Sequence, residues 1–212
     1  MQIKVFSFNP FQEKTYIIYD EKTSDCAIID PGCYYEEEEK KLVNFLTENQ
    51  LAPTKILYTH CHLDHVFGAK FLAEQYPLVK FYAHPYENYF IEHALEEWQK
   101  FGITIQQPPA ISHFISEQEK ISIGSITLQV ICTPGHSLGG VCYYCEKENI
   151  LFCGDTIFAG SVGRTDLFGG NEDTLIHSIR QKLFNLPDET LLYCGHGYPT
   201  TIGNEKQSNP YL

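Results

Sequence analysis

Thr59-His60-Cys61-His62-Leu63-Asp64-His65 is the stretch of this sequence that decides the fold. It follows an apolar run, Ile56-Leu57-Tyr58, and it gathers three histidines and an aspartate on one short loop. Imidazole and carboxylate groups are the ligands that divalent metals such as zinc take from proteins. Without a cation the cluster is hard to explain, because neighbouring imidazoles repel when protonated and buried polar groups need partners. The stretch therefore indicates a metal site directly after a buried strand.

Three further segments share one pattern, in which a strand-like run is followed by glycine and then by a ligand-type residue. They are Val130-Ile131-Cys132-Thr133-Pro134-Gly135-His136, Leu151-Phe152-Cys153-Gly154-Asp155 and Leu192-Tyr193-Cys194-Gly195-His196. Glycine lets the chain turn tightly or approach another backbone closely. A side chain just past a buried strand is held at the edge of the sheet. The pattern predicts that these three strand ends converge with the histidine loop.

The resulting candidate ligands are His60, His62, Asp64, His65, His136, Asp155 and His196. Seven protein ligands exceed what one tetrahedral site holds, and they suit two metals that share a bridging carboxylate. Five imidazoles and two carboxylates select zinc, iron or manganese over calcium or magnesium, and zinc is the metal we expect. A water bound at an open position would ionise near neutral pH, since a metal lowers its pKa from ~15.7 to ~7.

The bulk properties exclude several classes of protein. A chain of 212 residues is long enough for one substantial core, so we expect a single domain over residues 1–212. A net charge of −12 argues against binding to nucleic acid or to an anionic membrane. The start of the chain lacks a signal-peptide pattern, and eight cysteines without one suggest a reducing cytoplasm. The expected partner is a small molecule, and a homodimer stays open.

Patterns of apolar residues predict two β-rich halves, each with strands followed by helices, packed face to face with the helices outside. Strands are expected at about 3–8, 15–19, 26–29, 56–59, 79–83, 120–123, 127–132, 141–145, 150–153 and 191–194. Helices are expected at about 34–49, 67–75, 85–101 and 174–184, with an irregular connection at 107–116. The Cys142-Tyr143-Tyr144-Cys145 pair is interpreted as part of a buried strand, because residues i and i+3 point to opposite faces.

His60-Cys61-His62-Leu63-Asp64-His65 resembles, position for position, the signature of the metallo-β-lactamase-fold hydrolases. The chain is more narrowly similar to the glyoxalase II-like, or hydroxyacylglutathione hydrolase, branch in its single-domain bacterial form. That likeness is carried by Thr133 to Ser137, Gly154 to Thr156, Gly163 to Asp166 with Gly169-Gly170, Gly195 to Gly197, and the ending from Thr200 to Pro210. The resemblance implies an α/β fold, an αββα sandwich of two mixed sheets with the metals at one edge.

The resemblance also implies the role of each ligand. His60, His62 and His136 would hold the first metal, and Asp64, His65 and His196 the second. Asp155 would bridge the two with a water or hydroxide, and Asp64 would orient that nucleophile. Several true β-lactamases carry a metal-binding cysteine where this chain has Asp155, which argues against β-lactam hydrolysis. The implied activity is metal-dependent hydrolysis of small acyl-thioesters such as S-lactoylglutathione.

The residues expected to contact the substrate depart from the best-known relatives. Arg164 stands where those enzymes use a lysine, and Asp166 replaces a substrate-binding tyrosine. Tyr198 matches a tyrosine that contacts the thiol carrier, so Arg164 and Tyr198 are the predicted substrate contacts. The C-terminal helical domain of eukaryotic-type glyoxalase II, which supplies part of its glutathione site, is expected to be absent.

Two other functions remain open. The first is a persulfide dioxygenase, an oxidoreductase of the same fold that binds one iron, here through His60, His136 and Asp155. The segment Gly163-Arg164-Thr165-Asp166 is compatible with both branches. The second is a non-catalytic metal sensor, which is disfavoured because every ligand position is intact.

Overall fold

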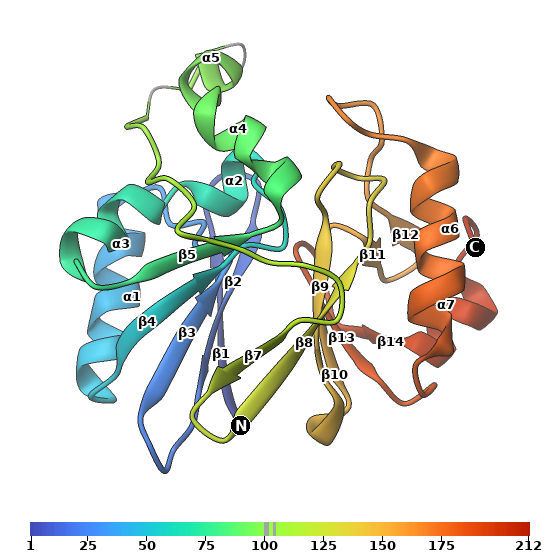
Figure 1. The fold of residues 1–212 in the computed structure, drawn as a ribbon, viewed down its shortest axis with the longest axis horizontal. Coiled ribbons are helices and arrows are strands. Elements are labelled where there is room, and N and C mark those ends of the chain that lie inside the picture. The colour runs from blue at the N-terminus through green and yellow to red at the C-terminus, as the bar shows by residue number, and fades with distance from the viewer. Residues whose placement is uncertain (100–101, 104) are drawn as a thin grey trace. The chain divides into compact units, whose positions relative to one another are not determined.

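The computed structural model describes residues 1–99, 102–103 and 105–212 (Figure 1). Its chain divides into two compact units, one of residues 1–114 with 123–126 and the other of residues 115–122 with 127–212. The expectation of one domain over residues 1–212 stays a prediction. Among the described residues, no helix combines the length and the hydrophobicity that crossing a membrane requires.

The first unit is built on a mixed six-stranded sheet in the order β1-β2-β3-β4-β5-β6. Its strands are β1 (Gln2–Phe8), β2 (Glu13–Tyr19), β3 (Asp25–Ile29), β4 (Ala52–Leu57), β5 (Lys80–Ala83) and β6 (His113–Phe114). The first three strands pair antiparallel, and β3 to β6 pair parallel. The turn at residues 20–25 joins β2 to β3, as its hairpin chemistry predicts.

The core of the first unit lies where its helices cover one face of this sheet (Figure 1). The helices are α1 (Glu36–Glu48), α2 (Leu63–Val66), α3 (Ala69–Gln75), η1 (Pro85–Glu87), α4 (Asn88–Glu92) and α5 (Ala94–Gln99). Leu42 and Leu46 of α1 and Leu72 of α3 are buried with Ile28 and Ile56 of the strands. The sequence specifies this contact, because the apolar residues recur at helical spacing in α1 and at alternate positions in the strands.

The other mixed sheet, in the order β14-β13-β10-β9-β8-β7, belongs to the second unit except at the turn between β7 and β8, whose residues 123–126 are counted with the first unit. Its strands are β7 (Lys120–Ile123), β8 (Ile126–Cys132), β9 (Val141–Cys145), β10 (Ile150–Gly154), β13 (Leu191–Cys194) and β14 (Thr200–Thr201). Leu175, Ile179 and Leu183, from α6 (Glu172–Lys182) and η3 (Leu183–Asn185), pack on Leu151 and Leu192. Cys142 and Cys145 are both buried in β9, as predicted.

A small hairpin of β11 (Ile157–Phe158) and β12 (Ser161–Val162) follows β10, and the last helix, α7 (Ile202–Ser208), holds it in place. Glu205 of α7 is buried and accepts hydrogen bonds from the Gly160 N–H at 2.9 Å and the Asn209 Nδ2 at 2.8 Å. Its other carboxylate oxygen accepts from the Thr200 hydroxyl at 2.6 Å. One carboxylate thereby joins the hairpin to both ends of the C-terminal segment.

Most of the expected elements form, and several differ in extent. The helix expected at 67–75 forms as α3 from Ala69 to Gln75, and the separate short helix α2 precedes it inside the histidine loop. The segment expected to be helical from 85 to 101 forms three short helices that end at Gln99, and residues 100–101 lie outside the described residues. The irregular connection at 107–116 contains the short strand β6. The sequence pattern missed β11, β12, β14, α7 and the 3₁₀ helices η1, η2 (Glu146–Glu148) and η3 as separate elements.

Candidate metal centre

The histidine loop leaves the carboxyl end of β4, a strand with a parallel neighbour on each side. His62 is the residue before α2, so Asp64 and His65 lie in the first turns of that helix. His60 and His65 are buried, and their ring centroids lie 4.1 Å apart. The ring of His62 lies 4.7 Å from that of His60, and Asp64 Oδ2 lies 3.8 Å from His65 Nε2. The structure thus brings together the four ligands predicted in this loop.

A buried carboxylate behind the loop, Asp30, orients His65. Asp30 follows β3, and its Oδ2 lies 3.0 Å from His65 Nδ1. A carboxylate can only accept here, so His65 carries its proton on Nδ1 and its lone pair on Nε2. Histidines that bind metals commonly donate their second ring nitrogen to a carboxylate in this way.

Asp30 orients His60 through Thr59. The Thr59 hydroxyl donates its single proton to Asp30 Oδ2 at 2.6 Å, and the Thr59 N–H donates to Asp30 Oδ1 at 2.7 Å. The 3.1 Å contact between Thr59 Oγ1 and His60 Nδ1 must therefore use a proton from the histidine. The lone pair of His60 is then on Nε2, the same arrangement as in His65.

Asp30 could be taken for a ligand, because one ligand atom of each of Asp30, His60 and His65 lies within 4.8 Å of the others. The hydrogen bonds indicate instead that Asp30 lies behind the ligands and orients them. Both of its oxygens accept protons from Thr59, and it faces the protonated nitrogen of His65. A metal at Asp30 would have to displace these protons, whereas the Nε2 side of the histidines offers lone pairs.

The second unit gathers His136, Asp155 and His196 at the carboxyl ends of β8, β10 and β13. Strands β10 and β13 are parallel neighbours, and the Gly195 N–H donates to the Gly154 carbonyl at 2.7 Å, so Asp155 and His196 leave the same edge. Asp155 Oδ2 lies 3.7 Å from His136 Nε2 and 3.5 Å from His196 Nε2. The convergence predicted for these strand ends is present within this unit.

His136 is oriented by a backbone carbonyl. Its Nδ1 lies 2.7 Å from the carbonyl oxygen of Arg164, which can only accept, so the lone pair is on Nε2. That nitrogen faces the carboxylate of Asp155, and neutral imidazole and carboxylate both bring electron pairs to the space between them. Two electron-pair donors that face each other can both bind a cation placed between them, so the chemistry of this pair fits a bound metal.

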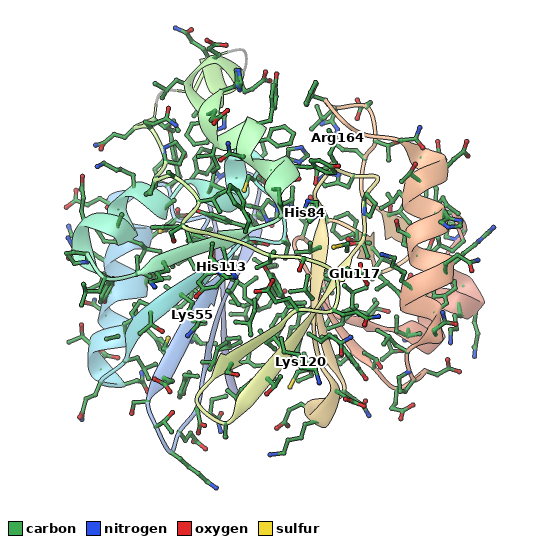
Figure 2. The ribbon with its side chains drawn as sticks, in the orientation of Figure 1. Lys55, His84, His113, Glu117, Lys120 and Arg164 are labelled. Atoms are coloured by element: carbon green, nitrogen blue, oxygen red, sulfur yellow. The ribbon has the colours of Figure 1, made fainter. Side chains whose placement is uncertain are left out.

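The predicted substrate contacts lie on exposed loops of the second unit. The side chain of Arg164, labelled in Figure 2, is 59% exposed and forms two hydrogen bonds with Asp166, Nε to Oδ1 at 2.7 Å and Nη2 to Oδ2 at 2.8 Å. These bonds hold the pKa of Asp166 down at about 2. Tyr198 is 84% exposed. Arg164 thus forms a salt bridge within its own loop, and its carbonyl orients His136.

The sequence pattern missed several buried groups that support the ligands. Asp30 follows a strand as the ligands do, so its position was a usable signal. Nothing in the sequence indicated a role for Glu87. Its buried carboxylate accepts a hydrogen bond from the Cys61 N–H at 2.7 Å, and this bond connects η1 to the histidine loop. Phe90 of α4 packs edge-on against His62 at 4.9 Å. Burial raises the pKa of the Cys61 thiol well above its ordinary value, which favours the neutral thiol.

Residues 8–196 match the family described as the Metallo-beta-lactamase superfamily. The chain belongs to this superfamily. It is 35% identical to the probable metallo-hydrolase YqgX of Bacillus subtilis, over 96% of this chain and 93% of that protein. It is 34% identical to the hydroxyacylglutathione hydrolase GloC of Haemophilus influenzae, over 100% of this chain and 98% of that protein.

Solved structures of the superfamily share the fold. The BLEG-1 B3 metallo-beta-lactamase superimposes with a TM-score of 0.90 at 35% identity, over 100% of this chain and 99% of the other. The structure of TTHA1623 in a di-iron-bound form gives a TM-score of 0.87 at 35% identity, over 99% of this chain and 100% of the other. ETHE1 from Myxococcus xanthus gives a TM-score of 0.79 at 27% identity, over 99% of this chain and 84% of the other. The predicted fold class, two mixed sheets with helices, is confirmed, and the chain is a metallo-hydrolase of this fold with histidine and aspartate clusters suited to metal.

Proposed function

We propose that this chain hydrolyses small acyl-thioesters in a metal-dependent reaction, with S-lactoylglutathione and similar hydroxyacylglutathione thioesters as the expected substrates. The observation that carries the proposal is the shared orientation of His60, His65 and His136. Each donates its Nδ1 proton to a protein acceptor and keeps its lone pair on Nε2. The likeness to a hydroxyacylglutathione hydrolase supports the choice of reaction.

We assign the ligands by the family resemblance together with these orientations. One zinc ion would take His60, His62 and His136, and a second would take Asp64, His65 and His196. Asp155 would contribute to both, and its contacts with His136 and His196 suit that shared position. Iron or manganese would suit the same ligands, and a similar chain has been seen with two irons.

The residues of this chain then divide the work of hydrolysis. When bound, the metal ions lower the pKa of a water and polarise the thioester carbonyl. Asp64 accepts a hydrogen bond from the attacking water and fixes its direction. The water oxygen bonds to the carbonyl carbon and the carbon–sulfur bond breaks. The products are a carboxylic acid and a thiol, which takes a proton from the water.

A second candidate is persulfide dioxygenase activity at one iron held by His60, His136 and Asp155. The similarity to ETHE1 from Myxococcus xanthus, over nearly the whole chain, is the observation that keeps this candidate. The two functions differ in their metal count, because a dioxygenase needs one iron whereas the hydrolase needs both sets of ligands. They also differ in oxygen consumption.

The test is a substrate panel on protein whose bound metal has been quantified. It contains S-D-lactoylglutathione, an acetyl thioester, glutathione persulfide and a chromogenic β-lactam. We expect two metals per chain and hydrolysis of thioesters that falls by at least about a hundredfold in Asp155→Ala. One iron per chain with oxygen uptake on the persulfide would favour the second candidate. Full thioesterase activity in Asp155→Ala would contradict the role of that residue.

A further inference from the structure

We propose that Glu87 is a positioning residue for the metal assigned to His60 and His62, because its carboxylate holds the stretch of backbone that carries both rings. The inference deepens the proposed function and rests on its ligand assignment. Glu87 lies in η1, 26 residues after Cys61 in the sequence, and it is fully buried. Glutamate is almost never fully buried unless it is paired, so the group that it contacts is informative.

Carboxylates hold the histidine loop after it leaves the sheet. The Tyr58 N–H still donates to a carbonyl of β5, at 2.9 Å. The Thr59 N–H then donates to Asp30 Oδ1, and the Cys61 N–H donates to Glu87 Oε2, both at 2.7 Å. A buried N–H group without an acceptor is costly, so these carboxylates do here what a neighbouring strand does in a sheet. Asp30 acts from the end of β3 and Glu87 from the segment after β5.

The hydrogen bond to Glu87 falls between two predicted ligands. Cys61 separates His60 from His62, and the rings of these two histidines lie 4.7 Å apart. His62 has an extended backbone, with φ −64° and ψ 155°, and side chains two positions apart on an extended chain point the same way. A shift of the Cys61 amide would therefore move both rings relative to a shared metal.

The turn that carries Glu87 is itself fixed. It begins at His84, which follows β5 and is labelled in Figure 2. The His84 carbonyl accepts the Glu87 N–H at 2.9 Å, and His84 Nδ1 accepts the Tyr86 N–H at 3.3 Å. Pro85 adds its restricted φ at the first position of the turn. Strands β4 and β5 are parallel neighbours, so this turn and the histidine loop leave the same edge of the sheet.

Helix α4 adds a second contact to the same stretch of the loop. It begins directly after Glu87, and Figure 1 shows it beside α2. Phe90 of α4 packs edge-on against the His62 ring at 4.9 Å. The far end of α4 is held as well, because the Gln107 Nε2 donates to the Ile91 carbonyl at 2.6 Å. Helix α4 thus supports the ring of His62, while Glu87 supports its backbone.

Asp64 and His65 have separate support. They lie in α2, where the His65 N–H donates to the His62 carbonyl at 3.1 Å. The His65 ring also has its own partner, because Asp30 Oδ2 lies 3.0 Å from its Nδ1. Loss of the Glu87 contact should therefore spare the metal assigned to Asp64 and His65 while it disturbs the other metal. This selectivity separates a positioning role from general support of the fold.

The test is a stepwise titration of chelator-treated protein with zinc in competition with a chromogenic chelator, which gives a dissociation constant for each metal. It compares the wild type with Glu87→Ala, which has no acceptor, and Glu87→Asp, whose carboxylate is one methylene short. Glu87→Gln keeps an oxygen that can accept the Cys61 N–H. Glu96→Ala, exposed in α5 of the same unit, is the control. Cobalt(II) in place of zinc reports the ligand geometry through its visible absorption.

Glu87→Ala and Glu87→Asp should weaken one of the two constants by about 10- to 100-fold and leave the other within about twofold. The weakened constant should be the one that His62→Ala also weakens, and the effect of Glu87→Ala should vanish in the His62→Ala background. The cobalt spectrum should change with it. Glu87→Gln should stay within about threefold of the wild type, and Glu96→Ala should match it.

Equal weakening of both constants would overturn the inference, and so would unchanged constants in a folded protein of lower stability. Equal losses in Glu87→Gln and Glu87→Ala would mean that charge acts in place of the hydrogen bond, and would also overturn it. If Glu87→Ala does not fold, Glu87→Asp decides the question. Protein that binds zinc as expected and hydrolyses no thioester would refute the proposed function alone, because the dissociation constants still decide the role of Glu87.

Discussion

The Nδ1 atom of His65 lies 3.0 Å from the Oδ2 atom of Asp30, and both side chains are buried. The same Asp30 oxygen accepts the Thr59 hydroxyl at 2.6 Å, and that hydroxyl in turn accepts from His60. One carboxylate therefore sets the protonation of two predicted ligands, which makes it the most informative residue for mutation outside the ligand set.

Asp30→Asn should weaken metal binding by about 10- to 100-fold, the range found for outer partners of ligating histidines. An amide has one acceptor oxygen, and its NH₂ group would face a donor from Thr59 or from His65. Affinity is measured by competition with a chromogenic chelator. Asp25→Asn, at the exposed start of β3, is the matched control. Unchanged affinity in a folded Asp30→Asn protein would contradict the orienting role.

Glu205→Gln should lower the free energy of unfolding by about 1–3 kcal/mol, the cost of a buried polar group that loses its partner. The three groups that face Glu205 all donate, from Gly160, Thr200 and Asn209, and an amide nitrogen cannot accept from any of them. Urea unfolding followed by circular dichroism measures the change. Gln207→Glu, on the exposed side of α7, should be neutral. Equal stability of the two variants would show that the hairpin needs no such support.

Gly32→Ala should destabilise the first unit by about 1–3 kcal/mol, as overpacking of a filled core does. The new Cβ would lie 2.0 Å from Glu13 Oε2 and 2.6 Å from the Asp64 carbonyl oxygen, so the chain around a predicted ligand must shift. Thermal unfolding and metal content per chain are the measurements. A variant with wild-type stability and metal content would contradict this close packing.

Asp20 should stabilise the fold in a pH-dependent way. Hydrogen bonds to its carboxylate from the Ser125 side chain, from the Ser125 N–H at 2.6 Å and from the Lys22 N–H at 2.9 Å lower its pKa from 3.8 to about 2. The unfolded chain then binds the proton more tightly than the folded one. The stabilisation is therefore complete above the unfolded pKa and is lost as pH falls through about 2.

The measurement for Asp20 is the difference in urea unfolding between the wild type and Asp20→Asn from pH 7 down to pH 2. The difference should be constant near neutral pH and should shrink below about pH 4. A difference that grows as the pH falls would have the wrong sign.

The predictable part of the site consists of residues at the ends of apolar strands. His136, Asp155 and His196 could be found because a strand-like run, a glycine and a ligand-type residue follow one another in each case. Glu87 could not be identified from the sequence. Its carboxylate accepts a hydrogen bond from a backbone N–H that is distant in sequence, and nothing in the helical segment around Glu87 indicates that contact. The pairing of Arg164 with Asp166 was equally open, since a side chain that could bind substrate could also bind its neighbour.

The elements that the sequence pattern missed are short or polar. Helix α7 runs from Ile202 to Ser208 with two buried residues, Ile202 and Glu205, so it has almost no apolar periodicity. It begins because the Thr201 side chain accepts the Asn204 N–H at 3.2 Å. Gly68 lies between α2 and α3, and an added Cβ there would lie 2.3 Å from Cys33 Sγ. Such a contact between distant segments leaves no signal in the local sequence.

We expect the chain to be a thioester hydrolase that uses two metal ions. The most direct measurement is a stepwise addition of zinc to chelator-treated protein, with S-D-lactoylglutathione hydrolysis and bound metal followed together. The rate of hydrolysis should rise with metal occupancy and reach its plateau at two equivalents per chain. A protein that binds two equivalents and leaves the thioester intact would contradict it.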